Sequence, residues 1–176
     1  KREDSYVWKN VHIADVDVSQ LILTNARLFW PNDSLKLKDG INVSLHEGAS
    51  LYLCANASDS NFEGHKLGTV TINSIGRDEK YDYYPILGDY NAVTKFSIEK
   101  LVISDDSGCT IDFSDDYTKC TGIGDIEVGK NARLVANSED VLEIANLTVA
   151  EGGIFQTDGI KVTGDTILTD KSTIAL

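Results

Sequence analysis

The sequence lacks methionine and has only two prolines and three cysteines among its 176 residues. It also lacks any run of about 18 apolar residues, the length a membrane-spanning helix needs, so we expect no direct membrane insertion. The first ten residues are charged and polar and show no secretory leader. Since an initiator methionine is missing too, we expect the chain to be a piece of a longer precursor.

Basic residues are scarce. The chain has 16 Lys and Arg against 28 Asp and Glu, a net charge of −12. An acidic surface repels phosphate backbones, which argues against nucleic acid as a partner. It also disfavours anionic lipids and anionic glycans, and it favours a soluble, monomeric protein.

The cysteine count is odd, so the three thiols cannot all pair within one chain. Cys109 and Cys120 are eleven residues apart, a spacing that allows a small closed loop. The cysteines and the three histidines show no zinc-ligand spacing. The sequence therefore predicts no metal site and no cofactor.

One sequence pattern recurs along the chain: apolar-x-apolar, a three- or four-residue turn, then apolar-x-apolar. Residues 126–137 (IEVGKNARLVAN) align without a gap on residues 147–158 (LTVAEGGIFQTD). Residues 43–54 (VSLHEGASLYLC) fit the same template, with Gly or Asn in the turn, where a positive φ is useful. Corresponding apolar positions predicted from this template are Leu28 with Leu51, Ile111 with Leu134, and Leu134 with Phe155.

Fixed-period similarity of this length indicates a stacked architecture. The segments between turns alternate with period two, which is typical of strands, and we interpret residues 138–147 as strands with a corner rather than a helix. The register of leucine-rich repeats does not fit. We therefore predict an all-β fold, a single-stranded parallel β-helix (β-solenoid) of about 20–23 residues per coil. A β-sandwich with similar hairpins is the alternative. The predicted core comprises Val43, Leu45, Leu51, Leu53, Val70, Ile72, Leu101, Ile103, Ile111, Phe113, Ile126, Val128, Leu134, Leu147, Val149, Phe155, Ile160 and Val162.

The repeat weakens between residues 55 and 100, which we interpret as a loop-rich insertion with a hairpin inside one solenoid segment spanning 1–176. Four of the seven tyrosines lie there. Tyrosine offers a large contact area at a low entropic cost, so a protruding loop of this composition is a candidate binding site. The candidate ligand-binding residues are Tyr81, Asp82, Tyr83, Tyr84 and Tyr90. The alternative is a hairpin whose tyrosines pack back onto the rod.

Acidic residues cluster between positions 105 and 116. Five carboxylates in twelve residues suggest Ca²⁺, but the spacing matches no EF-hand loop, and we interpret the cluster as two solvated turns. The acid pairs are also the only feature shared with a polysaccharide hydrolase. Neither a G-x-S-x-G elbow nor a phosphate-binding loop occurs. We predict that the protein is not an enzyme. The residues of the cluster are Asp105, Asp106, Asp112, Asp115 and Asp116.

Residues 126–170 (IEVGKNARLVANSEDVLEIANLTVAEGGIFQTDGIKVTGDTILTD) resemble the passenger domains of bacterial autotransporters, and the resemblance extends over residues 21–54 and 101–176. It implies a right-handed β-helix on the bacterial cell surface, with a role in adhesion, aggregation, toxin delivery or proteolysis. Because the chain has the repeat, no catalytic motif and a tyrosine-rich insertion, we predict adhesion to a host protein, a host glycan or a copy of itself. The resemblance also implies a Cys109–Cys120 disulfide, since such passengers tolerate closely spaced cysteine pairs, whereas Cys54 departs from the pattern. A β-helical carbohydrate-active enzyme and an inert structural spacer are the alternative functions.

Overall fold

A computed structural model describes residues 19–30, 39–53, 64–74, 83–88 and 93–176. These residues form fifteen β-strands and no helix, so none of them forms a helix able to cross a membrane. The strands are β1 (Gln20–Thr24), β2 (Arg27–Trp30), β3 (Ile41–His46), β4 (Ser50–Leu53), β5 (His65–Asn73), β6 (Ile86–Leu87), β7 (Thr94–Ile103), β8 (Gly108–Ser114), β9 (Thr118–Val128), β10 (Arg133–Ser138), β11 (Leu142–Val149), β12 (Ile154–Thr157), β13 (Ile160–Val162), β14 (Thr166–Leu168) and β15 (Thr173–Ala175).

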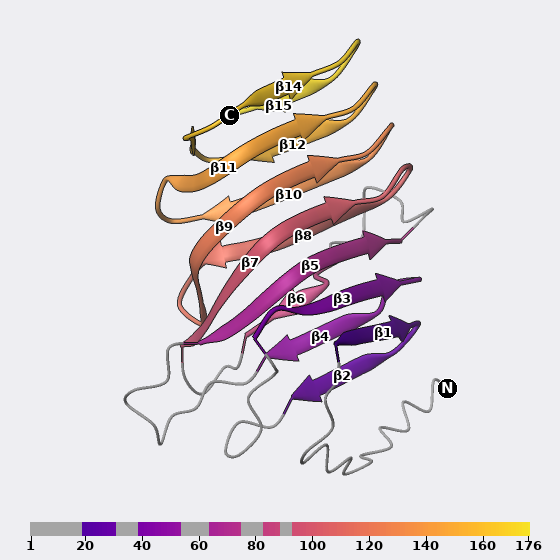
Figure 1. The fold of residues 1–176 in the computed structure, drawn as a ribbon, viewed down its shortest axis with the longest axis vertical. Helices are drawn as coiled ribbons and strands as arrows, with labels where there is room; N and C mark the ends of the chain where they lie inside the picture. Colours follow the sequence, from indigo (N-terminus) through magenta and orange to yellow (C-terminus); the bar gives the residue numbers. More distant parts are fainter. Residues whose placement is uncertain (1–18, 31–38, 54–63, 75–82, 89–92) are drawn as a thin grey trace, which may run out of the picture.

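The strands form two parallel stacks. The first stack runs β1-β3-β5-β7-β9-β11, and in the next layer both β13 and β14 pair with β11. The second stack holds β2-β4-β6 and, further along, β8-β10-β12-β15. The two stacks meet in one antiparallel pairing, between Ser114 of β8 and Lys119 of β9. Figure 1 shows the resulting layers, each a strand of the first stack followed by one of the second, rising in sequence order from indigo to yellow. This order is compatible with a β-solenoid.

The register places one inward row through seven consecutive layers: Leu23, Leu45, Ile72, Ile103, Val128, Val149 and Leu168. Few residues separate neighbours in this row at both ends of the stack, as from Leu23 to Leu45 and from Val128 to Val149. It is longest in the middle, from Leu45 to Ile72 and from Ile72 to Ile103. Residues 54–63, 75–82 and 89–92, which lie outside the described residues, fall in these two longest steps.

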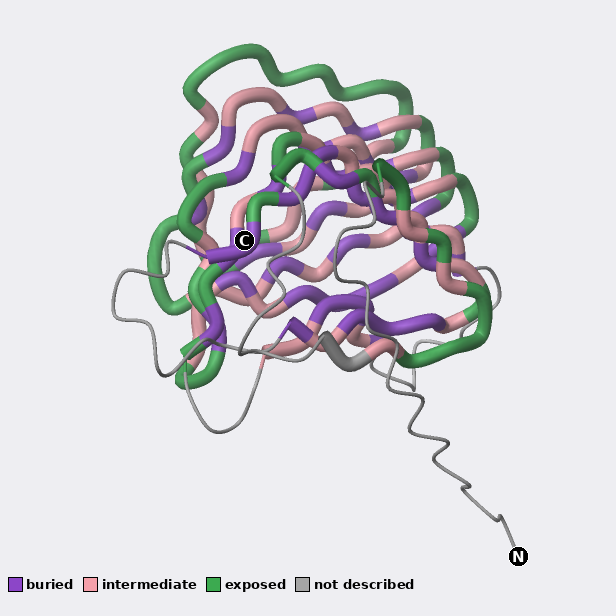
Figure 2. The backbone as a smooth tube through the Cα atoms, turned by 60° about the horizontal axis from the view of Figure 1, so that its bottom comes forward, coloured by how far each residue is buried: buried purple, intermediate pink, exposed green. Residues whose placement is uncertain are grey.

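The interior of the stack is apolar. Sixteen of the eighteen residues predicted to form the core are buried, and the other two, Ile160 and Val162, are half-buried in β13. Exposure increases at the last layer, where β14 is exposed along its whole length (Figure 2). No described strand covers that layer, so its inward side chains remain partly in contact with solvent.

One predicted register is wrong. Leu134 lies opposite Cys109 rather than Ile111, and Ile111 lies opposite Ala136. The turn before β8 has four residues, closed by a 3.1 Å hydrogen bond from the Ser107 N–H to the Ser104 carbonyl. Strand β8 therefore begins early enough for Cys109 to be its first inward residue. Because the shift is two residues, Ile111 still points inward.

Equivalent turns between the stacks carry a positive φ at the same position. The residues are Asp106 (56°), Asn131 (53°), Gly152 (68°) and Lys171 (59°). In each turn the next residue donates its N–H to the carbonyl three positions earlier, at 2.9–3.2 Å. The Asn and Gly expected at the positive-φ position are confirmed for Asn131 and Gly152.

The segment 55–100 contributes to both stacks. β5, β6 and most of β7 lie within it and pair in parallel with their neighbours. Its described part thus consists of stacked strands and their ends, and the rest of the predicted insertion lies outside the described residues.

Candidate binding site

The acidic residues at 105–116 serve the backbone and the turns. The Asp105 carboxylate accepts the Lys130 N–H at 2.8 Å, and that of Asp106 accepts the Asn131 side-chain amide at 3.1 Å. Asp112 accepts the Asn137 amide at 2.8 Å. Across the ranges that the structure describes, no group of three or more His, Cys, Asp or Glu side chains is arranged to hold a metal ion.

The tyrosine candidates do not share one exposed surface. Tyr83 is 4% exposed, belongs to the core and donates its hydroxyl hydrogen to the Ala49 carbonyl. Tyr84 is half-buried, and its carbonyl accepts the Ser50 hydroxyl at 3.0 Å. Tyr83 is therefore part of the interior, where its carbonyl also accepts the Thr110 N–H of β8. Tyr81, Asp82 and Tyr90 lie outside the described residues.

The implied disulfide does not form in this structure, where Cys109 and Cys120 are both free thiols. The strand geometry explains the separation. Ser114 lies opposite Lys119, next to Cys120, but Cys109 precedes Ser114 by five residues in the same strand. Five extended residues span about 16 Å, whereas the Cα atoms of a disulfide lie within about 7 Å. Cys54 lies outside the described residues.

A cavity of about 460 Å³ opens where β9 and β11 diverge, and we call it the β9–β11 notch. The two strands pair from Ile123 and Ile144 onward. Before that point, among the described strands, Cys120 and Gly122 of β9 pair only with β7, and Leu142 and Glu143 of β11 pair only with β13. The facing main-chain edges therefore stay open. The lining residues include Phe113, Lys119, Cys120, Thr121, Gly122, Ile123, Asp140, Val141, Leu142, Glu143, Ile144 and Thr163.

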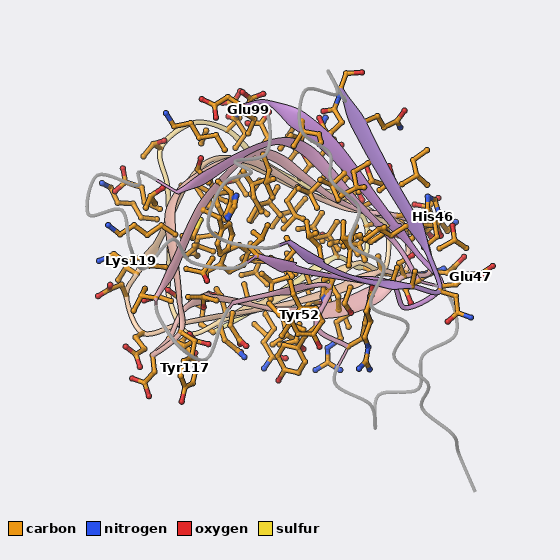
Figure 3. The ribbon with its side chains drawn as sticks, turned by 90° about the horizontal axis from the view of Figure 1, so that it is seen from below. His46, Glu47, Tyr52, Glu99, Tyr117 and Lys119 are labelled. Atoms are coloured by element: carbon orange, nitrogen blue, oxygen red, sulfur yellow. The ribbon has the colours of Figure 1, made fainter. Side chains whose placement is uncertain are left out.

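The notch has an apolar floor and a charged rim. Phe113, Ile123, Leu142 and Ile144 are at most 8% exposed and belong to the core. The rim carries exposed Lys119 on β9, exposed Glu143 on β11 and exposed Asp140 just before β11. Figure 3 places Lys119 and Tyr117 at one edge of the molecule, opposite the edge that carries His46 and Glu47. The notch therefore lies toward the edge that carries the β8–β9 turn, away from the β3–β4 turn at His46 and Glu47.

The rim charges differ in their partners. The Glu143 carboxylate pairs with the Lys161 ammonium group at 2.8 Å. The Asp140 carboxylate makes neither a hydrogen bond nor an ion pair with any residue that the structure describes. Asp140 is therefore the acidic group at the notch that is available to a ligand.

Cys120 contributes a protonated thiol to the notch. Its Sγ donates to the Gly122 carbonyl at 3.4 Å, and burial raises the pKa of the thiol to about 12. A thiol in this state is a poor nucleophile at neutral pH, and none of the lining residues is a histidine that would act as its base. The notch is thus equipped to bind a ligand through shape, main-chain groups and charge.

Sequence reasoning missed the notch. Its lining residues have ordinary types for strands and turns, and the cavity arises from the divergence of two strands separated by about 20 residues. The only local signal is the Gly122–Gly124 pair within β9, since glycine inside a strand often marks a bulge or a close approach.

Comparisons with protein families, with curated proteins and with solved structures found no match to this chain.

Proposed function

We propose that this chain is a segment of a single-stranded parallel β-helix that acts as a non-enzymatic binding scaffold on a bacterial cell surface. Coils of about 20–23 residues would form its two ends, with longer coils between them. The role is adhesion to a host protein or glycan, or association with a second copy. The resemblance of residues 126–170 to autotransporter passengers supplies the cellular location.

The observation that carries this proposal is the inward row from Leu23 to Leu168, which keeps its register through seven layers. Neighbouring layers bury each other's apolar face, so the stack holds a long lateral surface in a fixed geometry. The net charge of −12 keeps that surface soluble and directs it away from nucleic acids. These properties suit a scaffold that presents edges and loops.

The enzyme alternative is weakly supported, because the carboxylates proposed for catalysis are engaged in hydrogen bonds within the turns. Asp105 and Asp106 are held in hydrogen bonds to Lys130 and Asn131 within stacked turns. A glycoside hydrolase needs two carboxyl groups facing a substrate across a cleft. The β9–β11 notch carries two other carboxylates, Asp140 and Glu143, and that of Glu143 is held in an ion pair with Lys161. Binding is therefore the better supported role.

Deletion of residues 81–90 is unsuitable as a test, because it removes Tyr83 and Ile86 from the core. Two point substitutions made together test the predicted loop instead. The purified protein is labelled and applied to epithelial cells, to matrix proteins and to a glycan array, and sedimentation velocity measures self-association. The variant Tyr81→Ala/Tyr90→Ala is compared with the parent protein in the same assays. Equal urea unfolding midpoints show that the substitutions leave the fold intact.

Adhesion by the parent protein and weaker adhesion by the tyrosine variant support the proposal together with the loop assignment. Adhesion that survives in the variant retains the scaffold role but refutes the tyrosine loop. If the parent protein binds no surface and does not self-associate, the proposal is wrong. Release of reducing ends from a polysaccharide panel would favour the enzyme.

A further inference from the structure

We propose that the β9–β11 notch binds an extended polypeptide segment that pairs with the open main-chain edges of the two strands. This inference rests on the proposed binding role and deepens it, because it names the chemistry of the partner and the place where it binds. Neither of the described tyrosines of that segment, Tyr83 and Tyr84, lines the notch.

The main-chain edges carry the argument. β9 and β11 are neighbours in a parallel sheet, yet their pairing starts only at Ile123 and Ile144. Where Gly122 and Glu143 face the gap, each strand is paired on its far side only. Such an edge presents N–H and carbonyl groups, with one irregularity in β9, where Thr121 is an extra residue between the partners of Phe96 and Ser97. The ligand that matches such groups is another polypeptide main chain.

The cavity has room for such a segment. Its volume of about 460 Å³ falls within the range of about 300–1,000 Å³ for ligand sites. The floor formed by Phe113, Leu142 and Ile144 is buried and apolar. In an extended peptide alternate side chains point to one side, so one apolar side chain of the peptide faces this floor while its neighbours face the rim.

The overall charge of the protein favours a basic peptide. Of the three charged side chains that line the notch, Glu143 is paired with Lys161, whereas Asp140 and Lys119 have no partner among the described residues, and Asp140 is the one available to a cation. The net charge of −12 attracts a cationic partner over a longer range. A peptide that alternates lysine with valine meets both requirements, and its glutamate counterpart is the matched probe of opposite charge.

The binding test uses the folded full chain, labelled with ¹⁵N, and the peptide acetyl-Lys-Val-Lys-Val-Lys-amide. We expect saturable amide shifts centred on residues 120–122 and 142–143. The same peptide with N-methylated valines lacks the N–H donors, and we expect its affinity to be lower by about tenfold, since each hydrogen bond contributes several-fold. The glutamate peptide should also bind more weakly.

Two glycines provide matched site variants. A Cβ at Gly122 meets no atom within 4 Å, and Gly122 lines the notch, so Gly122→Phe obstructs it without a clash at Cβ. Gly108 lies in β8 and does not line the notch, and its Cβ would be 3.7 Å from the Arg133 carbonyl oxygen, an ordinary contact. We expect Gly122→Phe to weaken peptide binding by about tenfold or more and Gly108→Phe to change it by less than about twofold.

A second pair tests the charge. Asp140→Lys replaces an acid that lines the notch, whereas Glu139→Lys makes the same change at an exposed neighbour that does not line it. We expect the larger loss of lysine-peptide affinity for Asp140→Lys. Equal losses would mean that only the overall charge of the protein matters, which would refute the specific role of the rim.

The inference is overturned if the lysine-valine peptide produces no shifts at the notch, if N-methylation leaves its affinity unchanged, or if Gly122→Phe binds it as the parent protein does. Shifts at the same amides with maltohexaose, without any from the peptide, would assign the notch to a glycan instead. These outcomes are separate from adhesion to cells. Failure of the peptide with intact adhesion refutes this inference alone, and binding of the peptide without adhesion refutes the surface role alone.

Discussion

At the scale of single residues, two glycines in β9 experience opposite environments. A Cβ on Gly124 would be in hard contact with the Glu99 carbonyl oxygen of the neighbouring strand, whereas a Cβ on Gly122 would enter open space. The contact at Gly124 is with main chain, so the strands themselves would have to separate. The tight approach of β7 and β9 at this point therefore requires glycine.

We expect Gly124→Ala to lower the free energy of unfolding by about 3 kcal/mol, at the upper end of the range for overpacking. Gly122→Ala should leave it unchanged or raise it slightly, because alanine restricts the unfolded chain. Urea unfolding followed by circular dichroism measures both variants. Equal losses in the two variants would mean that the β7–β9 contact is not the cause.

Alkylation tests directly whether Cys109 and Cys120 are free thiols, as in the structure, or form a disulfide. Burial raises the pKa of both the Cys109 and the Cys120 thiol, the latter to about 12. Both therefore remain protonated at pH 8, and only the thiolate reacts with alkylating agents. In a Cys54→Ser background, we expect iodoacetamide to label the folded protein slowly and the urea-unfolded protein quickly at two positions.

The control for this labelling is intact mass without reductant. A mass lower by about two hydrogens, with no labelling after unfolding, would show that Cys109 and Cys120 form the disulfide that the resemblance implied. Fast labelling of the folded protein would show that Cys120 is more exposed to solvent than the structure indicates.

At the scale of elements, the turn between β8 and β9 depends on one carboxylate. A single Asp115 oxygen accepts the Tyr117 N–H at 2.7 Å, the Thr118 N–H at 2.6 Å and the Thr118 hydroxyl at 2.8 Å. This turn also brings the two stacks together, through the pairing of Ser114 with Lys119. Its loss would weaken one wall of the notch.

Replacing Asp115 with alanine removes all three hydrogen bonds, and we expect the free energy of unfolding to fall by about 2 kcal/mol. Asp115→Asn retains an oxygen acceptor and should lose less. The adjacent exposed Asp116 serves as the control, with a change for Asp116→Ala within about 0.5 kcal/mol. Urea unfolding midpoints measure the three variants. A comparable loss of stability in Asp116→Ala would mean that the removal of a charge, and not of the hydrogen bonds, destabilises the Asp115 variant.

The elements also show how much the sequence can predict. Period-two alternation identified the strands, and the Gly and Asn residues identified turns whose φ is positive at Asn131 and Gly152. The sequence did not predict the positive φ of Asp106 or Lys171, because neither residue type was expected at that position of a turn. The register error at Ile111 followed, because turn length rather than apolar pattern decides which inward residue comes first.

Features that depend on contacts between distant segments could not be predicted from the sequence. Tyr83 is an aromatic residue in a polar segment, and its burial depends on β4 and β8, which are distant in the chain. The notch depends on where two strands separate, which no local composition encodes. Alternation reports which face a residue occupies, but contact between distant segments decides whether that face is covered.

At the scale of the whole molecule, the inward row is covered in its middle layers and open at its last layer. Val128 is 1% exposed between Ile103 and Val149, whereas Leu168 is 50% exposed above Val149. A stacked architecture derives its stability from contacts between neighbouring layers. The same substitution should therefore have a different cost at different heights in the stack.

We expect Val128→Asp to lower the free energy of unfolding by about 3–5 kcal/mol, because an unpaired charge would be buried between two layers. Leu168→Asp should cost less than about 1.5 kcal/mol, since its carboxylate remains in contact with water. Urea unfolding of both variants measures the difference, and size-exclusion chromatography shows whether either unfolds outright. Equal costs at the two positions would mean that the chain does not gain its stability layer by layer, and the scaffold role built on that stacking would lose its physical basis.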